Sequence, residues 1–593
     1  MQDDRLREEA LDYHRLPTPG KLSTKPSKPH STAHELSLAY SPGVAYPCLE
    51  ISEDEDLAFS YTSKGNLVGV VSNGTAVLGL GDIGAIAGKP VMEGKGLLFK
   101  SFADIDVFDI EVDRTSVDDF VEAVKAIAPT FGGINLEDIK APECFEIERR
   151  LKSELDIPVM HDDQHGTAII SGAALINGLD VVGKEIGHVT VVISGAGASA
   201  ISCARHYLRL GVKRDNILMC DSKGLLTKSR AAKGELNEYK MEFVNDRKDC
   251  SLGDVMIGAD VFLGLSKGGV VSGEMVASMA DKPLIFALAN PDPEILPEDV
   301  RAVRDDAIIA TGRSDYPNQI NNVLGFPYIF RGALDVRATS ITEKMKMAAT
   351  MALSQLAKET VPDDVLEAYK GASIQYGPEY LIPKPFDARV LIWEASAVAQ
   401  AAVEEGIARI DPDSFDLQRY REELESRLGL TRSVMRSVIN RAKRNLQRIV
   451  FSEGEDPTII KAASHCIREK ICTPVLLGQV ERIHSAIAEL GLDFECEIID
   501  PRYDERRRGD YADELHDLRG RRGISRLDAI ELLKQPTWFA PMMVRKGDAD
   551  GYLGGVSHNY PDIVKPCLKI IGTSEDDHLS LIHISEPTRP SSI

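Results

Sequence analysis

The sequence has few aromatic residues, few cysteines and no long apolar run. Aromatic residues make up 6% of its 593 residues. The nine cysteines form no CxxC pair and show no His/Cys spacing suited to zinc, which excludes a disulfide scaffold and a structural zinc site. The N-terminus shows no signal peptide, and no segment approaches the ~20 apolar residues of a membrane span. We therefore expect a cytoplasmic protein with no membrane partner.

An excess of positive charge is also missing. Lys and Arg total 69 against 92 Asp and Glu, so the formal net charge is −23. Such a chain repels phosphate backbones, and no nucleic acid partner is expected. A length of 593 residues corresponds to three or four domains at the usual ~150 residues each.

Short β-rich runs alternate with helical stretches along most of the chain. After residues 188–194, which form a buried strand, further strands are predicted at 216–221, 261–264, 284–289 and 307–312. This alternation predicts an α/β fold with largely parallel sheets and a doubly wound domain in the middle of the chain.

The two ends of this α/β region differ in composition from its centre. The first forty residues are polar and rich in proline, which predicts an extended arm that lies over a surface or reaches toward a partner subunit. Residues 411–425 are acidic and are predicted to be a linker into a third unit, which has its own alternation of strands and helices.

A dinucleotide-binding turn follows the buried strand at 188–194. Gly195, Gly197, Ala198 and Ala200 lie in a G-x-G-x-x-A pattern between this strand and a helix, where glycines allow a pyrophosphate to approach the helix N-terminus. Asp221 lies 21 residues beyond Ala200, close to the ~20 expected for an acid that contacts the adenine ribose. The alternative is a glycine turn in another kind of βαβ unit.

The residues after Asp221 leave the choice of cofactor open. Lys223 is placed to pair with a 2′-phosphate, whereas Asp221 itself would oppose one. Both NAD and NADP therefore stay open as the cofactor, and NADP is slightly favoured.

Two acidic motifs bracket another predicted strand. They are Glu137-Asp138 and Asp162-Asp163, and three carboxylates from two loops would suit Mg²⁺ or Mn²⁺. The alternative is that these acids cap turns and helices. By themselves, Tyr40 would be a half-buried turn residue and Lys95 a surface charge.

Seven motifs together are more specific than any one of them. Their order, AYSPGVA, GLGDIGAIAGKPVMEGKGLLFK, NLEDI, HDDQHGTA, SGAGASA, ALANPDPE and YPNQINNVLGFPYIFRGALD, resembles that of the bacterial-type malic enzymes over residues 1–420. The resemblance implies oxidative decarboxylation of (S)-malate to pyruvate and CO₂ with reduction of NADP or NAD. It also implies dependence on Mg²⁺ or Mn²⁺ and a homo-oligomer.

The resemblance also assigns residues. It implies that Lys95 is the catalytic lysine, hydrogen-bonded by Asp162, and that Tyr40 is the catalytic tyrosine, which protonates C3 of the enolate. As a base near neutral pH, Lys95 requires a lowered pKa, which we expect from burial and a nearby cation. The implied metal ligands are Glu137, Asp138 and Asp163. The implied substrate and nicotinamide ligands are Asn290, Asn321 and Asn322.

One position departs from the family pattern. Larger members of the family place an arginine shortly before GLGD to hold a malate carboxylate, whereas this chain has Thr75-Ala76-Val77 there. The sequence therefore leaves open which group takes that role.

The third unit resembles a different family. Residues 448–457, 549–556 and 564–573 resemble the N-terminal half of the phosphate acetyltransferases. This implies a hybrid malic enzyme whose third part is a truncated α/β domain with a regulatory and oligomer-forming role, for which acetyl-CoA is a plausible effector.

The expected division of the chain has four parts. They are a malic-enzyme N-terminal domain at 1–160, a Rossmann NAD(P)-binding domain at 161–425, a partial phosphate acetyltransferase-like domain at 426–578 and a non-native tail at 579–593. Two other functions stay open. One is an acetyl-CoA-binding or acyl-transferring protein with a non-catalytic front block, and the other is a malate dehydrogenase that stops at oxaloacetate.

Overall fold

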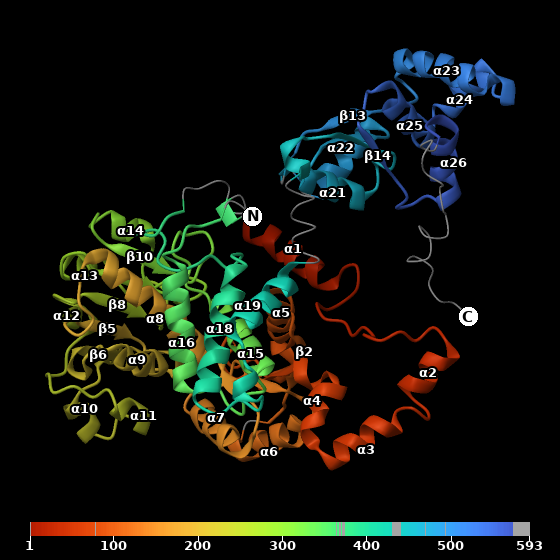
Figure 1. Cartoon of the computed structure of the whole chain (residues 1–593). Coiled ribbons are helices and arrows are strands. Elements are labelled where there is room, and N and C mark those ends of the chain that lie inside the picture. Colours follow the sequence, from red (N-terminus) through yellow and green to blue (C-terminus); the bar gives the residue numbers. More distant parts are fainter. Residues whose placement is uncertain are drawn as a thin grey trace. The chain divides into compact units, whose positions relative to one another are not determined.

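The computed structural model divides the chain into two compact units (Figure 1). The larger unit is Ala10–Leu428, and the smaller combines Met1–Glu9 with Gly429–Ile593. The structure describes residues 2–572 except positions 78, 115, 363–364, 367–368, 370–373, 430–440, 469, 491 and 493. The tail predicted at 579–593 lies outside the described residues.

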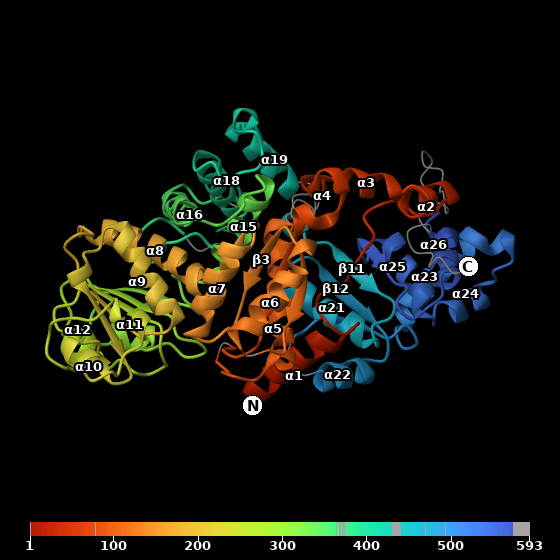
Figure 2. The same ribbon diagram turned by 90° about the horizontal axis from the view of Figure 1, so that it is seen from below.

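The larger unit begins with helices that precede its first sheet. They are α1 (Gln2–Arg15), which starts in the smaller unit, α2 (Ala33–Ala39), α3 (Ala45–Glu53) and α4 (Ala58–Tyr61), with 3₁₀ turns η1 (Glu55–Leu57) and η2 (Ser63–Asn66). Neither α2 nor α3 has a buried residue. In Figures 1 and 2 both helices lie apart from α5, and we call residues 33–53 the arm. The extended arm predicted for the first forty residues is helical at 2–15 and 33–39.

The first sheet has four parallel strands in the order β2-β1-β3-β4. The strands are β1 (Leu67–Ser72), β2 (Asp106–Glu111), β3 (Gly133–Leu136) and β4 (Val159–His161). The helices between them are α5 (Ala85–Ala103), α6 (Val117–Ile127) with η3 (Ala128–Thr130), and α7 (Glu143–Glu154). Strand β1 is buried at every position, as expected for an inner strand covered on both faces.

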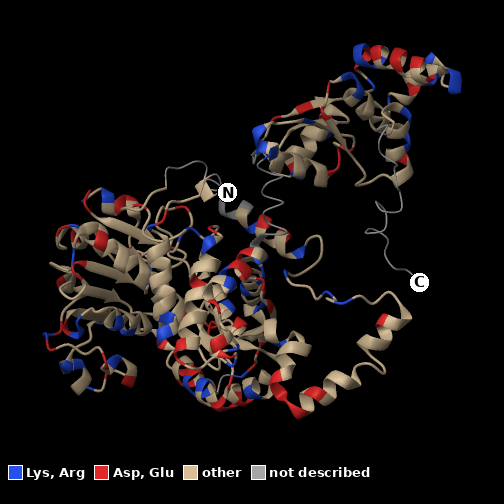
Figure 3. Cartoon of the chain, in the orientation of Figure 1, with Lys and Arg blue, Asp and Glu red and all other residues tan. Residues whose placement is uncertain are grey.

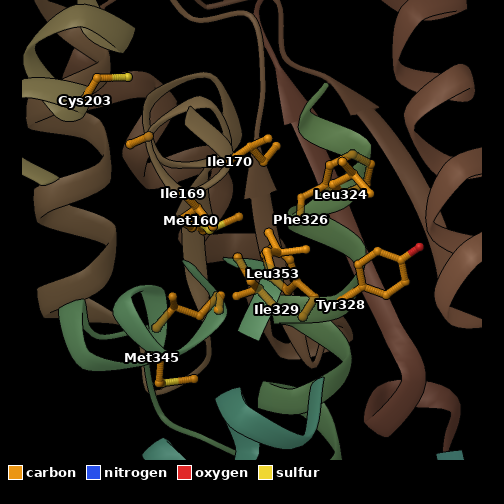
Figure 4. Close-up of a cluster of buried hydrophobic side chains, with 14 of the residues drawn as sticks. Met160, Ile169, Ile170, Cys203, Leu324, Phe326, Tyr328, Ile329, Met345 and Leu353 are labelled. Carbon is orange, nitrogen blue, oxygen red and sulfur yellow. The ribbon is translucent and has the colours of Figure 1, made fainter. Parts of the chain in front are cut away.

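A long helix, α8 (Asp162–Val182), starts directly after β4 and leads to the second sheet. Its sequence is apolar enough, and the helix long enough, to pass a length-and-composition test for a membrane span, yet 67% of the tested window is buried inside the protein. A buried core helix meets the same test. Figure 4 shows Ile169 and Ile170 of this helix among the buried side chains of Phe326, Ile329 and Leu353.

The second sheet has the strand order β10-β9-β8-β5-β6-β7 and is parallel except for the β6–β7 pair. Its strands are β5 (Val191–Ser194), β6 (Ile217–Asp221), β7 (Gly224–Leu225), β8 (Val261–Gly264), β9 (Leu284–Ala287) and β10 (Ile308–Thr311). Because the order reverses at β5, the sheet has the switch point of a doubly wound fold next to the glycine turn.

Helices surround this sheet and close the unit. Those between its strands are α9 (Ala198–Leu210), η4 (Arg214–Asn216), α10 (Lys228–Ala232), α11 (Glu238–Met241), α12 (Leu252–Met256), α13 (Gly273–Ala277) and α14 (Pro297–Arg301). Those after it are η5 (Asn322–Leu324), α15 (Phe326–Asp335), α16 (Glu343–Leu356), α18 (Arg389–Glu404), η6 (Pro412–Ser414) and α19 (Leu417–Gly429).

The linker predicted at 411–425 is wrong, because most of this segment forms α19. Tyr420 and Leu424 are buried, and the Tyr420 hydroxyl donates to Asp335 Oδ2 at 2.8 Å. The two residues are four apart and share one face of the helix. The acidic residues that suggested a linker belong to the same amphipathic helix.

The smaller unit has its own parallel sheet in the order β13-β12-β11-β14. Its strands are β11 (Arg448–Phe451), β12 (Thr473–Leu477), β13 (Glu497–Ile499) and β14 (Gly551–Leu553). Its helices are α21 (Pro457–Arg468), α22 (Val480–Glu489), α23 (Glu505–Arg519), η7 (Gly520–Arg522), α24 (Arg526–Leu532), α25 (Pro536–Lys546) and α26 (Tyr560–Ile570). Two hydrophobic clusters pack in this unit, one containing Phe539 and the other Ile460. In both units acidic and basic residues are interspersed (Figure 3).

Candidate active site

A cavity of about 1010 Å³ opens in the larger unit. Its lining residues come from α1, the segment after α1, α5, the ends of β3 and β8–β10, and the start of α8 and of α9. They include Tyr13, His14, Lys21, Gly79, Gly94, Lys95, Glu137, Asp138, Asp163, Thr167, Ser199, Ser266, Lys267, Asn290, Asn321 and Asn322. Residues from all but one of the seven motifs therefore meet at one place, and the exception is the motif around Tyr40.

Three carboxylates form the acidic end of the cavity. Glu137, Asp138 and Asp163 each offer an oxygen, and these oxygens lie within 4.8 Å of one another. Asp138 follows Glu137 directly after β3 and has a positive φ of 54°, and its N–H donates to Asp163 Oδ2 at 2.9 Å. A set of three carboxylate oxygens fits Mg²⁺ or Mn²⁺, which prefer oxygen ligands.

Lys95 extends from α5 toward these carboxylates. Its Nζ lies 2.5 Å from Asp162 Oδ2, 2.9 Å from Glu137 Oε1 and 4.0 Å from the ring centroid of Phe326. Burial by itself would lower the pKa of Lys95, but the charges of Asp162 and Glu137 hold that pKa above its ordinary value. The lowered pKa expected from the sequence is therefore not produced by the chain's own groups, which surround the ammonium with negative charge.

Asp162 connects Lys95 to a second loop. Its Oδ2 also accepts from Asn322 Nδ2 at 3.3 Å, and Asn322 Oδ1 accepts from the Thr167 hydroxyl at 3.1 Å. Burial raises the pKa of Asp162, although Lys95 opposes that shift. A methyl group at Gly166 would lie 2.1 Å from Asp162 Oδ1, so only glycine fits beside this carboxylate.

The start of α8 is held by a buried ion cluster behind the cavity. Glu148 of α7 accepts from the His161 N–H at 3.2 Å and from His165 Nε2 at 2.9 Å. Burial would raise the pKa of Glu148, but His165 and Lys152 hold it well below its ordinary value. Burial lowers the pKa of His165 to about 4, so this ring is neutral at pH 7. The cluster fixes the turn that carries Asp162 and Asp163.

The glycine turn after β5 has the predicted form. Gly195 has a φ of 117°, and a methyl group there would lie 2.4 Å from the Leu265 carbonyl oxygen. Gly197 is the N-cap of α9, Ala198 is its first residue and Ala200 is buried. The Ser199 hydroxyl donates to the Asp163 carbonyl at 2.7 Å, which joins the turn to the acidic end of the cavity.

Asp221 lies at the end of β6, outside the cavity lining. Its Oδ2 lies 2.8 Å from Arg230 Nη2 and 3.3 Å from Lys240 Nζ, and its Oδ1 accepts from the Lys223 N–H at 2.9 Å. Burial would raise the pKa of Asp221, but Arg230 in particular holds it below its ordinary value. The negative charge that opposes a 2′-phosphate is therefore already paired.

The remaining predicted ligands line the cavity from two loops. Asn290 follows β9, and Asn321 lies beside Asn322 at the start of η5. Glu294 is fully buried and links the loop after β9 to the loop after β8, because it accepts from the Ala289 N–H at 3.1 Å and from the Ser266 N–H at 2.9 Å.

Tyr40, a predicted catalytic residue, does not line the cavity, and neither does Asp162, which is joined to the lining residue Lys95 by an ion pair. Tyr40 lies at the end of α2 with 77% of its surface exposed, and α2 lies apart from α5 in both views (Figures 1 and 2). The tyrosine that lines the cavity is Tyr13 of α1. Sequence reasoning missed Tyr13 and Lys21 because the N-terminal segment carries no periodic pattern that indicates where it docks.

Comparison with known proteins gives the family. The model for the malic enzyme N-terminal domain matches residues 19–152, and that for the malic enzyme NAD binding domain matches residues 164–368. The NADP-dependent malic enzyme of Escherichia coli is 48% identical over 585 residues, which are 97% of this chain and 76% of the relative. The chain belongs to the malic enzyme family. The predicted α/β fold and family are thus confirmed, and neither alternative function is favoured.

Other malic enzymes extend the comparison. The NAD-dependent malic enzyme of Rhizobium meliloti is 48% identical over 573 residues, 96% of this chain and 74% of that relative. The malic enzyme structure from Pyrococcus horikoshii has a TM-score of 0.65 at 41% identity and covers 73% of this chain and 98% of its own. That from Entamoeba histolytica has a TM-score of 0.66 at 32% identity and covers 82% and 93%. The model described as phosphate acetyl/butaryl transferase matches residues 433–587.

Proposed function

We propose that the chain converts malate to pyruvate and CO₂ with reduction of NADP and requires a divalent cation. The observation that carries this proposal is the single cavity in which Lys95, the three carboxylates and the loop around Asn290 meet. Glu137, Asp138 and Asp163 would hold Mg²⁺ or Mn²⁺, which, when bound, supplies Lewis acidity to the C2 oxygen of the substrate.

Lys95 and Asp162 are suited to proton transfer at the C2 hydroxyl. Lys95 Nζ lies at the buried end of the cavity, where a neutral amine accepts a proton and the ammonium returns it. Asp162 fixes the direction of the side chain from one side and Glu137 from the other. Asn322 holds Asp162 in turn, so that the base has one orientation.

Tyr40 requires a second copy of the chain for its role as proton donor to C3. The arm exposes Leu36, Leu38, Tyr46 and Leu49, which is unusual for side chains of this size in a folded protein. The lining of the cavity also includes the exposed apolar side chain of Val91. We infer that the arm of one copy covers the cavity of another in a homo-oligomer with two-fold symmetry.

Mixing two inactive variants tests this arrangement. Tyr40→Phe and Lys95→Met are each expected to be nearly inactive alone, and their mixed dimers have one site with both residues intact. Subunit exchange should therefore restore up to about one quarter of wild-type turnover, by the statistics of a two-fold dimer. Tyr13→Phe mixed with Lys95→Met is the control. No recovery in the first mixture would contradict donation between subunits, and loss of activity in Tyr13→Phe alone would assign the donor to Tyr13.

NADP is favoured over NAD by the pairing of Asp221. With Arg230 and Lys240 already on this carboxylate and Lys223 beside it, a 2′-phosphate meets net positive charge. The deciding measurement is the formation of reduced cofactor from malate and Mn²⁺ with NADP and with NAD in parallel. Detection of pyruvate and CO₂ separates this function from simple dehydrogenation.

Acetyl-CoA is the effector proposed for the smaller unit. The match of residues 433–587 to phosphate acetyl/butaryl transferase supports it. The same malate assay with and without acetyl-CoA tests this role, and a rate that is unchanged at saturating acetyl-CoA contradicts it.

A further inference from the structure

Larger malic enzymes hold a malate carboxylate with an arginine shortly before GLGD, and this chain has Thr75-Ala76-Val77 there. Thr75 is the polar residue of this stretch, and its hydroxyl is used within its own loop. Its hydroxyl donates to Asn73 Oδ1 at 2.6 Å and accepts from the Lys140 N–H at 3.0 Å. The cation must therefore come from elsewhere in the cavity.

Three lysines line the cavity among the described residues, and no arginine does. Lys95 is held in two ion pairs, with Asp162 and Glu137. Lys267 lies two residues beyond Leu265, whose carbonyl contacts the glycine turn, and it therefore belongs to the cofactor side. Lys21 lies over α5, the helix that also carries Lys95.

The segment around Lys21 is docked on α5 by specific contacts. The Lys21 N–H donates to Glu93 Oε2 at 2.9 Å, and its Nζ donates to the Pro90 carbonyl at 2.5 Å. Gly20 has a φ of 88°, a conformation that favours glycine, and so turns the chain onto the helix. A methyl group at Gly94 would lie 3.6 Å from Lys21 Nζ, and Gly94 precedes Lys95 in the cavity wall.

We propose that Lys21 binds the C1 carboxylate of malate, an inference that rests on the proposed function. Lys21 Nζ has donors left after its bond to the Pro90 carbonyl, and it forms no ion pair with a carboxylate among the described residues. Burial lowers the pKa of Lys21 while Glu93 opposes that shift, which indicates an ammonium that is only partly compensated.

The chemistry of the reaction selects C1 rather than C4. The C4 carboxylate leaves as neutral CO₂, so a cation fixed on it would stabilise the substrate more than the transition state. The C1 carboxylate keeps its charge from malate through oxaloacetate to pyruvate. A cation on C1 therefore binds substrate, transition state and product equally, and its loss raises KM without lowering kcat.

Steady-state kinetics of the full chain with malate, Mn²⁺ and NADP test the assignment. In Lys21→Met the KM for malate should rise about ten- to hundred-fold, the range expected for loss of one charge-assisted hydrogen bond. The kcat should stay within about threefold, and the KM for NADP should not change. Lys21→Arg should retain most of the affinity. Lys25→Met, on the same segment but outside the cavity lining, is the matched control.

Inhibition by pyruvate separates the two carboxylates. If Lys21 holds C1, the inhibition constant of pyruvate rises in Lys21→Met by the same factor as the KM for malate. If the KM for malate rises in Lys21→Met while the inhibition constant of pyruvate stays unchanged, the assignment to C1 is wrong. An unchanged KM, or a rise in Lys267→Met instead, overturns the role of Lys21. A wild-type chain that forms no NADPH from malate overturns the proposed function, and this inference with it.

Discussion

Two acidic regions of the molecule differ in how fully their buried carboxylates are hydrogen-bonded. In the larger unit, Asp162 Oδ1 is buried and accepts no hydrogen bond from the described residues, while Oδ2 of the same carboxylate accepts from Lys95 and Asn322. In the smaller unit, Glu453 is also buried but accepts six hydrogen bonds from Gly555, Val556, Ser557 and His558. Both regions follow a parallel strand, where polar groups meet at the sheet edge.

The difference separates a reactive site from a structural one. A carboxylate whose oxygens are all satisfied by backbone N–H groups stabilises a loop and has no capacity left for a ligand. A cluster in which acids outnumber nearby cations lowers the stability of the fold, but its oxygens can still bind a ligand. Lys95 faces Asp162, Glu137 and Asp163, whose charges raise its pKa.

The largest expected effect is on metal activation. Asp163→Asn replaces one of three clustered carboxylates with a neutral amide, so Mn²⁺ and Mg²⁺ should no longer activate malate oxidation. Mn²⁺ binding, followed by calorimetry, gives a readout that is independent of turnover. Asp156→Asn, an exposed acid in the same region, is the control. Decarboxylation by Asp163→Asn without added metal would contradict the cluster as a cation site.

Lys95→Met should lower kcat by on the order of 10² or more, the range for removal of a positioned general base. Because the change also leaves Asp162 and Glu137 without their cation, NADP affinity is measured to show that the fold survives. The matched variant is Lys89→Met on the same helix, where the ammonium pairs with Asp109 and Glu111 away from the cavity. Near-normal turnover in Lys95→Met would refute its catalytic role.

Much of the fold was predictable because parallel strands are buried on both faces. The strand predicted at 261–264 coincides with β8, since a run of apolar residues bounded by turns has few other interpretations. The motifs at 135–138 and 161–167 meet because they lie at the ends of β3 and β4, two neighbouring parallel strands of the first sheet. The turn at 195–200 follows β5 of the second sheet and is joined to them by the hydrogen bond from the Ser199 hydroxyl to the Asp163 carbonyl.

The parts that sequence reasoning missed depend on docking between distant segments. Lys21 reaches the cavity through a segment held by Glu93 and Pro90, contacts that no local periodicity encodes. Tyr40 carries a family motif, yet its position depends on where the arm docks. The predicted linker failed for the same reason, because Tyr420 is recognised as a core residue only when Asp335 is beside it.

The smallest expected effect is on the smaller unit alone. Glu453→Gln puts an amide NH₂ against N–H donors, so the free energy of unfolding of this unit should fall by about 2 to 3 kcal/mol, as for loss of hydrogen bonds to a charged group. Trp538 belongs to this unit, and with Trp393→Phe as background it is the single tryptophan of the chain. Its fluorescence then follows the unit in urea. Glu531→Gln, which loses only a surface pair with Lys534, should change stability by less than about 0.5 kcal/mol.

The loss of stability in Glu453→Gln is expected to depend on pH. Burial would raise the pKa of Glu453, but the N–H groups of the loop at 555–558 hold it below its ordinary value. A depressed carboxyl pKa contributes stability that is fully present above the unfolded value of about 4.3 and is lost as the pH falls below it. The difference in the free energy of unfolding between wild type and Glu453→Gln should therefore be constant from neutral pH to about pH 5 and become smaller in more acidic solution. Malate turnover per folded enzyme should not change, because the hydrogen bonds that Glu453 accepts come from the loop at 555–558 of its own unit. A loss of kcat in this variant would show that this carboxylate has a functional role.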